Sequence, residues 1–467
     1  MSTTGRRTWA ALGATVAVAA SVTACGSAGA GDDNALPTAD AYLASTCPAV
    51  AVKPATDKEL TYWSMWTKDE PQGKVLQHAI DCFGKQTGVK VTVQWLGRKY
   101  LTQNLAPALN TDTVPDLFDQ DISQVGAAVV APGGTQSVDD VLGLAVGEGD
   151  KTVKDVLAPS SYDLPQNRDH AGHHFEIPYE LLGNAWWYNK DQVKDFTAPK
   201  TVDDLFQLFD KAKNSGKAAV SQDGDIDFYN AYFFTQLAAR YVGPGGLARA
   251  AADKTGQTWQ TEPRFRKAAQ IVERLAKSGY LIDGWNASKF PQVQQKWADG
   301  ESDYLFVGSW APSETREYLS KEGSDKKINY GSFQFPLPDG ATHDIVEQLP
   351  IGFAVTAKAK HAEAAKDFIA YFLNKDVLKG IPAVADNITP RPDLEVPADL
   401  ADVKKALDDP NKQHMIFMDG IDGLFGGKYV NDVFYPADDY LLKGTLGADE
   451  FIAQLADKTA EYWKSQA

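Results

Sequence analysis

Residues 60–95 read LTYWSMWTKDEPQGKVLQHAIDCFGKQTGVKVTVQW and contain two apolar runs separated by a helical pattern. Leu60 to Trp63 predicts a short strand. Apolar residues recur at helical spacing between 75 and 83, and Gly88 supplies a stop signal. Val89 to Trp95 then alternates between apolar and polar residues, as a strand does. A strand, a helix and a second strand in this order indicate parallel strands joined by a helix.

The alternation of strands and helices continues along the chain. Pro115–Phe118 begins another short apolar run, and Thr201 with Asp204 three residues later predicts a capped helix start. Further helices are expected at 265–275, 362–372 and 450–463, further strands at 303–307 and 350–356, and an extended proline-rich segment at 335–340. The pattern predicts an α/β fold with a mostly parallel sheet. About 440 residues exceed one ordinary core and indicate two lobes.

The N-terminus has the layout of a secretory signal. Arg6 and Arg7 precede the apolar stretch Ala10–Ala20, which is too short to span a membrane, and Val-Thr-Ala-Cys follows at 22–25. This ending resembles a bacterial lipobox, in which Cys25 is acylated (for example with palmitate) and becomes the first residue of the mature protein. Residues 1–24 are therefore expected to be a signal peptide. The arginine pair leaves the general and the twin-arginine export routes open.

The segment 25–57 is expected to be a lipidated tether followed by an N-terminal extension. Gly26–Asp33 is rich in glycine and lacks apolar periodicity, as in a flexible tether. No later stretch is long and apolar enough to span a bilayer, so the lipid is the only expected membrane anchor. Cys47 and Cys82 either form a disulfide in this oxidising compartment or are two buried thiols.

Composition and charge exclude several classes of function. The formal net charge is −16, and because residues 1–24 contain two arginines and no acid, the mature chain carries −18. An acidic protein is a poor partner for nucleic acid or anionic lipid, so a neutral or cationic ligand is favoured. The chain has no GxSxG, GxxxxGK[ST], HExxH or strand-following GxGxxG motif, so no catalytic signature and no cofactor are expected.

One histidine cluster has two interpretations. Residues 169–176, DHAGHHFE, contain three of the seven histidines: His170, His173 and His174. They could bind zinc or nickel, or the segment could be a hairpin with Asp-x-x-Gly turn chemistry. Neighbouring strand residues point to opposite faces, which favours the hairpin.

The positions of the tryptophan residues indicate a type of ligand. Nine of the eleven tryptophans lie between Trp63 and Trp310, and Trp66, Trp285 and Trp310 stand beside glycine or polar residues. An indole can stack on the C–H face of a sugar ring while polar side chains bind its hydroxyl groups. Packing in a core is the alternative for each ring, and Trp186 and Trp187 in particular read as core.

In chain order, these motifs resemble the extracellular solute-binding lipoproteins of bacterial ABC sugar importers. The matching pieces are the lipobox, Trp66 with Glu70, Pro115-Asp116, GNAWWYNK at 183–190, Pro199-Lys200-Thr201, Gly308-Ser309-Trp310, FPLPDG at 335–340, GFAV at 352–355 and Thr389-Pro390-Arg391. The resemblance implies a periplasmic-binding-protein-like fold with a ligand cleft between two lobes. The first lobe is expected at 58–182 plus 338–373 and the second at 183–337 plus 374–467, with crossings near Leu182, Pro338 and Leu373.

The resemblance also implies the site and its partners. The expected ligand-binding residues are Trp66, Glu70, Gln120, Asp121, Trp285, Trp310, Asn387 and Arg391. A mono- or oligosaccharide, with the many tryptophans favouring the longer ligand, would be clasped between the lobes and delivered to ABC permease subunits at the extracellular face of the membrane. A monomer that catalyses no reaction is expected. A lipid-anchored glycoside hydrolase or lyase, or a metal-scavenging protein using the histidine cluster, is the alternative.

Overall fold

The computed structural model describes residues 36–51, 56–423 and 427–466. The predicted signal peptide, Cys25 and the glycine-rich tether lie outside the described residues. No helix in the described part of the chain is long and apolar enough to cross a membrane.

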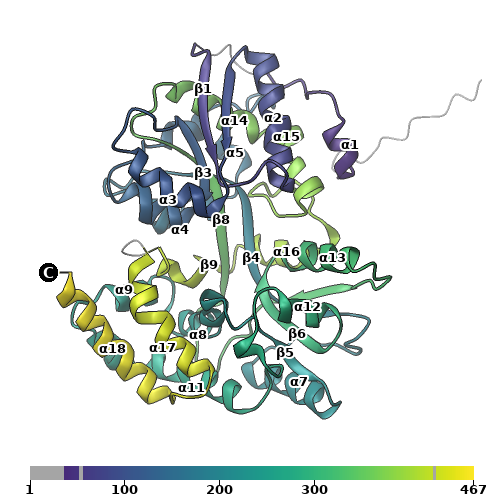
Figure 1. Ribbon diagram of the computed structural model, residues 1–467, viewed down its shortest axis with the longest axis vertical. Coiled ribbons are helices and arrows are strands. Elements are labelled where there is room, and N and C mark those ends of the chain that lie inside the picture. Colours follow the sequence, from purple (N-terminus) through teal and green to yellow (C-terminus); the bar gives the residue numbers. More distant parts are fainter. Residues whose placement is uncertain (1–35, 52–55, 424–426, 467) are drawn as a thin grey trace, which may run out of the picture. The chain divides into compact units, whose positions relative to one another are not determined.

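The described strands form one mixed sheet of nine strands with the order β2-β1-β3-β8-β4-β6-β5, while β7 pairs with β4 and β9 with β8 (Figure 1). They are β1 Glu59–Ser64, β2 Lys90–Trp95, β3 Leu117–Asp121, β4 Ile177–Asn189, β5 Ala218–Ser221, β6 Ser302–Gly308, β7 Tyr330–Phe333, β8 Ile345–Val355 and β9 Gln413–Ile416. The predicted α/β class is confirmed, and the predicted strand at 60–63 pairs in parallel with the one at 89–95.

The expectation of a mostly parallel sheet is wrong at the centre. β1 pairs in parallel with β2 and β3, and β5 with β6, as the helical connections require. The long strands β4 and β8, however, run antiparallel to each other, and β8 runs antiparallel to β3. The centre is antiparallel because β4 and β8 lead the chain out and back along the same path (Figure 1).

Helices cover the sheet at both ends. They are α1 Ala39–Leu43, α2 Pro71–Thr87, α3 Arg98–Ala108, α4 Ile122–Val125, α5 Val153–Val156, α6 Pro159–Tyr162, α7 Val202–Asn214, α8 Asp227–Val242, α9 Gly246–Ala252, α10 Gln257–Thr261, α11 Pro263–Lys277, α12 Gln292–Ala298, α13 Ala311–Lys321, α14 Ala362–Phe372, α15 Lys375–Leu378, α16 Ala401–Leu407, α17 Tyr435–Leu442 and α18 Ala448–Ser465. Gly88 ends α2 with a φ of 75°, and Thr201 and Asp204 form the expected capping box of α7.

The buried apolar residues form two separate cores. The first core draws mainly on residues 42–179 and 351–394, and the second on 181–346 and 400–462. α14 packs on β1 and β8 in the first, while α11 packs on α8 and α18 in the second. Trp186 and Trp187 are fully buried in the second core, where Trp186 stacks on Phe306.

Two of the three expected crossings lie elsewhere. Ala341 and Ile345 belong to the second core, and Val377 and Ile381 to the first, so Pro338 and Leu373 do not mark crossings. The chain passes between the cores within β4, within β8 and between Leu394 and Leu400, with Ile388 in the second core and Ile416 in the first as single exceptions. The proline-rich segment 335–340 forms only an isolated bridge, between Leu337 and Thr201, because proline cannot donate to a ladder of hydrogen bonds. The crossing strand is instead β8, which pairs with β4 over several residues.

The N-terminal extension is fastened to the first core. Cys47 and Cys82 are joined by a disulfide with a Cα–Cα distance of 5.2 Å. Tyr42 on α1 is buried, and its hydroxyl donates to the Val377 carbonyl at 2.6 Å. The extension therefore contacts α2 and the α15 region at once.

Candidate functional site

A cleft of about 810 Å³ lies where the two cores meet around β4 and β8. The lining residues on the side of the first core include Trp66, Glu70, Gln72, Arg98, Asp121 and Gln124. Those on the side of the second core include Phe228, Tyr229, Tyr232, Phe290, Trp310, Glu314, Phe417 and Tyr435. The crossing strands β4 and β8 contribute Glu180, Leu182, Leu349 and Ile351. The cleft is thus bordered by both cores and floored by the strands that connect them.

Trp66 is held rigidly on the first side. Its ring is 3% exposed, and its Nε1 donates to the Tyr179 hydroxyl at 2.7 Å. Tyr179 in turn donates to Asp119 Oδ2 at 2.7 Å, while Asp119 Oδ1 accepts the Met65 N–H at 3.0 Å. Burial raises the pKa of Asp119 to about 6 despite these hydrogen bonds. Of the charged residues that follow Trp66 in the sequence, Glu70 lines the cleft, and Lys68 and Asp69 are exposed.

Arg98 covers one face of the Trp66 ring. Its guanidinium carbon lies 4.3 Å from the ring centroid, a cation–π arrangement, and its Nη1 pairs with Glu70 Oε1 at 2.8 Å. Glu70 precedes α2 and also accepts the Thr67 N–H at 2.5 Å. Partial burial alone would raise the pKa of Glu70, but the hydrogen bonds from Thr67 and Arg98 lower it. Glu70 is therefore an ionised anchor for Arg98.

Glu180 lies on the floor, at an irregularity in the pairing of β4 with β8. Its Oε1 accepts from Gln72 Nε2 at 3.1 Å and from Asn387 Nδ2 at 2.5 Å. Its Oε2 is buried and has no hydrogen-bond partner in the described chain. Burial raises the pKa of Glu180 to about 7. Asn387 lies in the cleft as expected, and there it orients this carboxyl group.

Aromatic side chains form the second side. Trp310, just before α13, stacks on Tyr229 with ring centroids 5.9 Å apart and an interplanar angle of 22°. Phe417 contacts both Trp310 and Tyr232. Phe228 and Phe290 are 40% and 39% exposed, which is unusual for such rings. This side offers several apolar faces to a ligand.

The loop bearing Phe417 has a strained backbone. Met418 and Asp419 both have φ near +55°, in the left-handed region that non-glycine residues seldom adopt. The Asp419 carboxylate holds the loop by accepting the N–H groups of Gly245, Leu247 and Ala248. Met418 N–H donates to Glu347 Oε1 at 3.1 Å. These bonds fix Phe417 and Met418 against the cleft.

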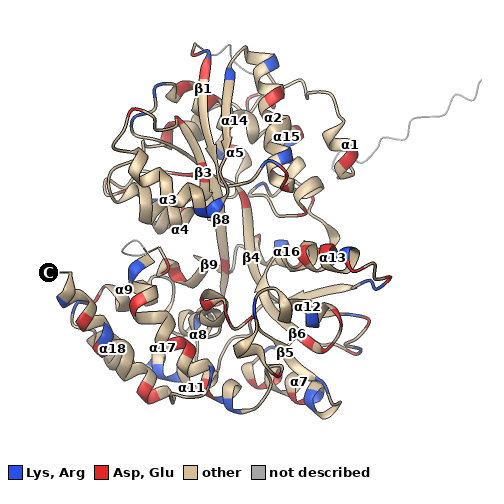
Figure 2. Cartoon of the chain, in the orientation of Figure 1, with Lys and Arg blue, Asp and Glu red and all other residues tan. Residues whose placement is uncertain are grey.

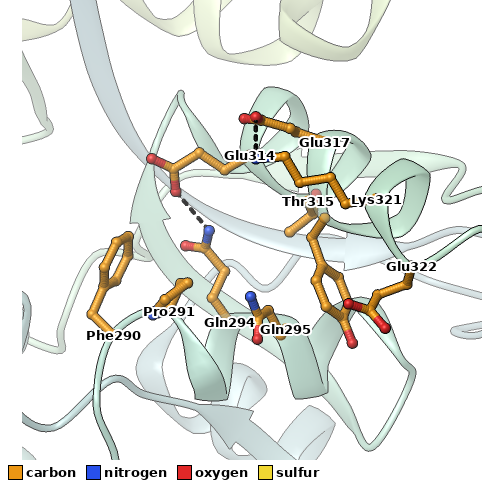
Figure 3. Close-up of a pocket in the computed structure, with 10 residues that line it drawn as sticks. Phe290, Pro291, Gln294, Gln295, Glu314, Thr315, Glu317, Lys321 and Glu322 are labelled. Atoms are coloured by element: carbon orange, nitrogen blue, oxygen red, sulfur yellow. Dashed lines mark hydrogen bonds and ion pairs between the residues drawn. The ribbon is translucent and has the colours of Figure 1, made fainter.

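A smaller pocket of about 310 Å³ adjoins the cleft and shares Phe290 and Glu314 with it. Figure 3 shows Phe290 and Glu314 at one end of this pocket and Lys321 with Glu322 at the other. Glu314 Oε2 accepts from Gln294 Nε2 at 2.6 Å, and burial raises its pKa. The open space thus extends along α13 beyond Trp310.

Three expected ligand-binding residues lie outside the cleft. Gln120 is buried against α3, donating to Thr102 at 3.1 Å, because it points to the opposite side of β3 from Asp121. Trp285 is packed into the second core. Arg391 is fully buried and pairs with Glu148 at 2.6 Å and Asp393 at 2.8 Å. The Arg391 charge is therefore neutralised by ion pairs within the protein and is not available to a ligand.

Trp66, Glu70, Asp121, Trp310 and Asn387 all line the cleft. Sequence reasoning missed Arg98, Glu180 and the aromatic residues of α8. Glu180 had a signal, since an acid within the apolar run Ile177–Leu182 must have a reason to be buried. Tyr229 had none, because the sequence DFYNAYFF reads as a helix buried on all sides.

The histidine segment is a hairpin, as the turn chemistry predicts. Arg168 bridges His174, and the Gly172 N–H donates to the Asp169 carbonyl at 3.0 Å. His174 Nδ1 lies 2.5 Å from Asp139 Oδ1. Among the described residues, no three His, Cys, Asp or Glu side chains are grouped so that they could hold a metal ion.

Known proteins share this fold. A solved probable secreted solute-binding lipoprotein from Streptomyces coelicolor has a TM-score of 0.68 at 16% identity, covering 86% of this chain and 98% of its own. A Bacillus licheniformis sugar transporter solved with stachyose gives 0.62 at 19% identity, covering 86% and 99%. A structure from work on xylan utilisation by Caldanaerobius polysaccharolyticus gives 0.65 at 18%, also covering 86% and 99%. These similarities establish the two-lobed fold.

Sequence comparison identifies the family. An uncharacterised ABC-transporter extracellular-binding protein of Pyrococcus horikoshii is 25% identical over 233 residues, so this chain spans about half the length of that relative (49% of each). The family model described as bacterial extracellular solute-binding protein matches residues 67–379, more than half of the chain. That range includes Glu70, Arg98, Glu180 and Trp310 of the cleft, whereas Met65 and Trp66 precede it and Asn387 and the lining residues from 417 onward follow it. The chain belongs to the bacterial extracellular solute-binding proteins, which bind a solute and are not enzymes.

Proposed function

We propose that this chain is the carbohydrate-binding component of an ABC importer and that its ligand lies in the cleft between the two cores. The observation that carries the proposal is the position of Trp66 and Trp310, which border one cleft from different cores. Stacked aromatic faces with carboxyl and amide groups at their edges suit the C–H faces and hydroxyl rim of a sugar. The stachyose complex of the Bacillus licheniformis protein supports this ligand class.

The size of the site favours an oligosaccharide over a monosaccharide. The cleft of about 810 Å³ continues into the pocket of about 310 Å³ through Phe290 and Glu314. Successive sugar rings need successive stacking surfaces, and Trp310 with Tyr229, Phe417 and Phe290 provides a row of them. A ligand of several rings would lie along this row.

Transport would use the difference between open and closed forms. Ligand contacts to both sides would favour closure about β4 and β8, and the permease would select the closed form through its differential affinity. Acylation of Cys25 would keep the protein, as a monomer, at the extracellular face of the membrane. Expression with a Cys25→Ser change should release the chain into the medium.

The first prediction tests the aromatic wall. Trp310→Ala should weaken oligosaccharide binding about tenfold or more, because it removes a stacking face. Isothermal titration against mono- to tetrasaccharides measures this, after a thermal-shift screen has found the sugars that bind. Trp463→Ala, on α18 and outside the cleft, is the matched control and should leave affinity unchanged. Unchanged affinity in Trp310→Ala, or release of new reducing ends from the sugars, would contradict the proposal.

A further inference from the structure

The cleft is lined by many more acidic than basic side chains. Its carboxylates are Glu70, Asp121, Glu180, Glu314 and Asp422, and Arg98 is the one cationic side chain among its described lining residues. Arg98 is already paired with Glu70. Within the part of the chain that the structure describes, none of the other four carboxylates forms an ion pair. Figure 2 shows basic residues on outer helices such as α2, α7 and α18 and an acidic segment on β4.

Glu180 shows most directly that the cleft lacks a hydrogen-bond donor or a positive charge beside a buried carboxyl group. The side chain is 0% exposed, both of its described partners are neutral amides on Oε1, and its Oε2 has no partner while it lines the cleft. A buried carboxylate is costly unless a cation or hydrogen-bond donors compensate it. A ligand that enters the cleft can supply both at once through a protonated amine.

A metal ion does not fit this pattern. No three carboxylates or histidines converge closely enough in the described chain to hold one. The acids are instead distributed over the first side, the floor and the second side of a long cleft with aromatic walls. The arrangement suits an extended organic cation.

Arg98 provides an internal example of cation binding at this site. Its guanidinium lies 4.3 Å from the Trp66 ring centroid and is paired with a carboxylate 2.8 Å away. An aromatic face with a neighbouring acid is therefore already used to bind a planar cation in this cleft. On the opposite side, Trp310 and Glu314 both line the cleft, and Glu314 accepts a hydrogen bond from the neutral Gln294 amide and forms no ion pair in the described chain.

We propose that the ligand is a carbohydrate carrying a protonated amino group, an amino sugar or amino-oligosaccharide, whose ammonium binds Glu180 with Glu314 or Asp121 contributing to the field. This inference rests on the proposed function and specifies its substrate class. It accounts for the unpartnered Oε2, for the excess of acids and for the aromatic walls together. A neutral sugar would satisfy the aromatic walls and could donate a hydroxyl hydrogen bond to Oε2, but it would supply no positive charge.

Matched oligosaccharides test the proposal. The tetramers of β-1,4-linked glucosamine, N-acetylglucosamine and glucose differ only at carbon 2, and the glucosamine tetramer alone carries basic amino groups. Titration calorimetry at pH 7 should give the glucosamine tetramer an affinity about tenfold above both neutral tetramers. This advantage should shrink as salt screens the charges.

Two variants separate charge from shape. Glu180→Gln keeps the volume and an amide oxygen for Gln72 and Asn387, and it should abolish the amine's advantage while changing neutral-sugar affinity less than about threefold. Glu461→Gln, an exposed acid on α18 paired with Lys458, is the control and should change neither. If Glu180→Gln misfolds by circular dichroism, Glu314→Gln is expected to show a smaller loss of the same kind.

The outcomes distinguish the two proposals. Neutral oligosaccharides that bind as tightly as their amine counterparts, or equal losses for both in Glu180→Gln, would overturn the amino-sugar inference and leave the carbohydrate proposal standing. If no carbohydrate binds, both proposals fail.

Discussion

Gly308 determines where the Trp310 ring lies. A Cβ at this position would lie 2.0 Å from Trp310 Cζ3 and 2.4 Å from Cε3, closer than non-bonded atoms approach. Gly308 ends β6 opposite Asn184 on β4, so the backbone has no room to move away from the ring. The absence of a side chain at 308 thus lets the indole lie flat over the end of the sheet and stack on Tyr229.

A single methyl group should therefore disturb the site. Gly308→Ala is expected to displace the indole and weaken sugar binding about tenfold, with a modest fall in melting temperature. Calorimetric titration and thermal denaturation measure the two effects. Gly143→Ala, where an added Cβ meets nothing within 4 Å, is the matched control. Equal affinities for Gly308→Ala and the parent protein would show that the ring's position is not critical.

The sequence alone predicted residues at the rim of the cleft, such as Trp66 and Trp310, but not Glu180 on its floor. Trp66 and Trp310 could be found because each stands beside turn or polar residues, where burial in a core is least favoured. Trp285 has the same signature, yet it packs against Gly224, whose missing side chain leaves space for the ring. Arg391 looks like a ligand in sequence because its partners Glu148 and Asp393 become apparent only in three dimensions.

At the scale of elements, the N-terminal extension depends on a covalent link to α2. The disulfide from Cys47 to Cys82 closes a loop with a sequence separation of 35. α1 itself is only five residues long, too short to be stable alone, and is held by Tyr42 against the first core. The extension is thus an appendage whose order comes from its attachment.

Removing the disulfide should lower stability without altering the cleft. A Cys47→Ala, Cys82→Ala double variant is expected to lose about 3–4 kcal/mol of unfolding free energy, the chain-entropy value for such a loop. Denaturant titration, followed by fluorescence, measures this. Sugar affinity should be unchanged, since neither cysteine lines the cleft. A loss of binding at full folding would show that the extension reaches the ligand.

Elements with strong local periodicity were predictable, and their connections were not. The helix at 71–87 and the strand at 90–95 follow from spacing and from Gly88. The crossing points do not, because the antiparallel pairing of β4 with β8 joins residues such as Leu182 and Leu349 that lie far apart in the chain. Pro336 and Pro338 led to the wrong prediction of a crossing at 335–340, because a locally extended backbone does not by itself form a strand.

At the scale of the whole described chain, buried acids shape the response to pH. Burial raises the pKa of Asp119 and Asp121 to about 6 and of Glu180, Glu347 and Asp422 to about 7. A carboxyl group with a raised pKa in the folded state binds protons more tightly there than in the unfolded chain. Stability from these groups is present below pH 4 and is lost as the pH rises through 6 and 7.

The melting temperature should therefore fall by several degrees between pH 5 and pH 8. Acids whose folded pKa is lowered, such as Asp116 and Glu148, do not reverse this trend, because their contribution is complete above pH 5. Thermal denaturation by calorimetry in buffers of equal ionic strength measures the effect. Glu180→Gln should flatten the curve in part. A melting temperature that rises over this range would contradict the raised pKa values of the buried acids in the folded protein.

The interleaving of the two cores has a consequence for how the protein is made. In the sheet, β3 pairs with β8, so β3 lacks this partner until residues 351–355 are synthesised, more than two hundred residues later. Until then, the first core also lacks the buried β8 residues Ile351, Phe353 and Val355. A nascent chain of this topology is therefore expected to complete its first core late, only after β8 has been synthesised.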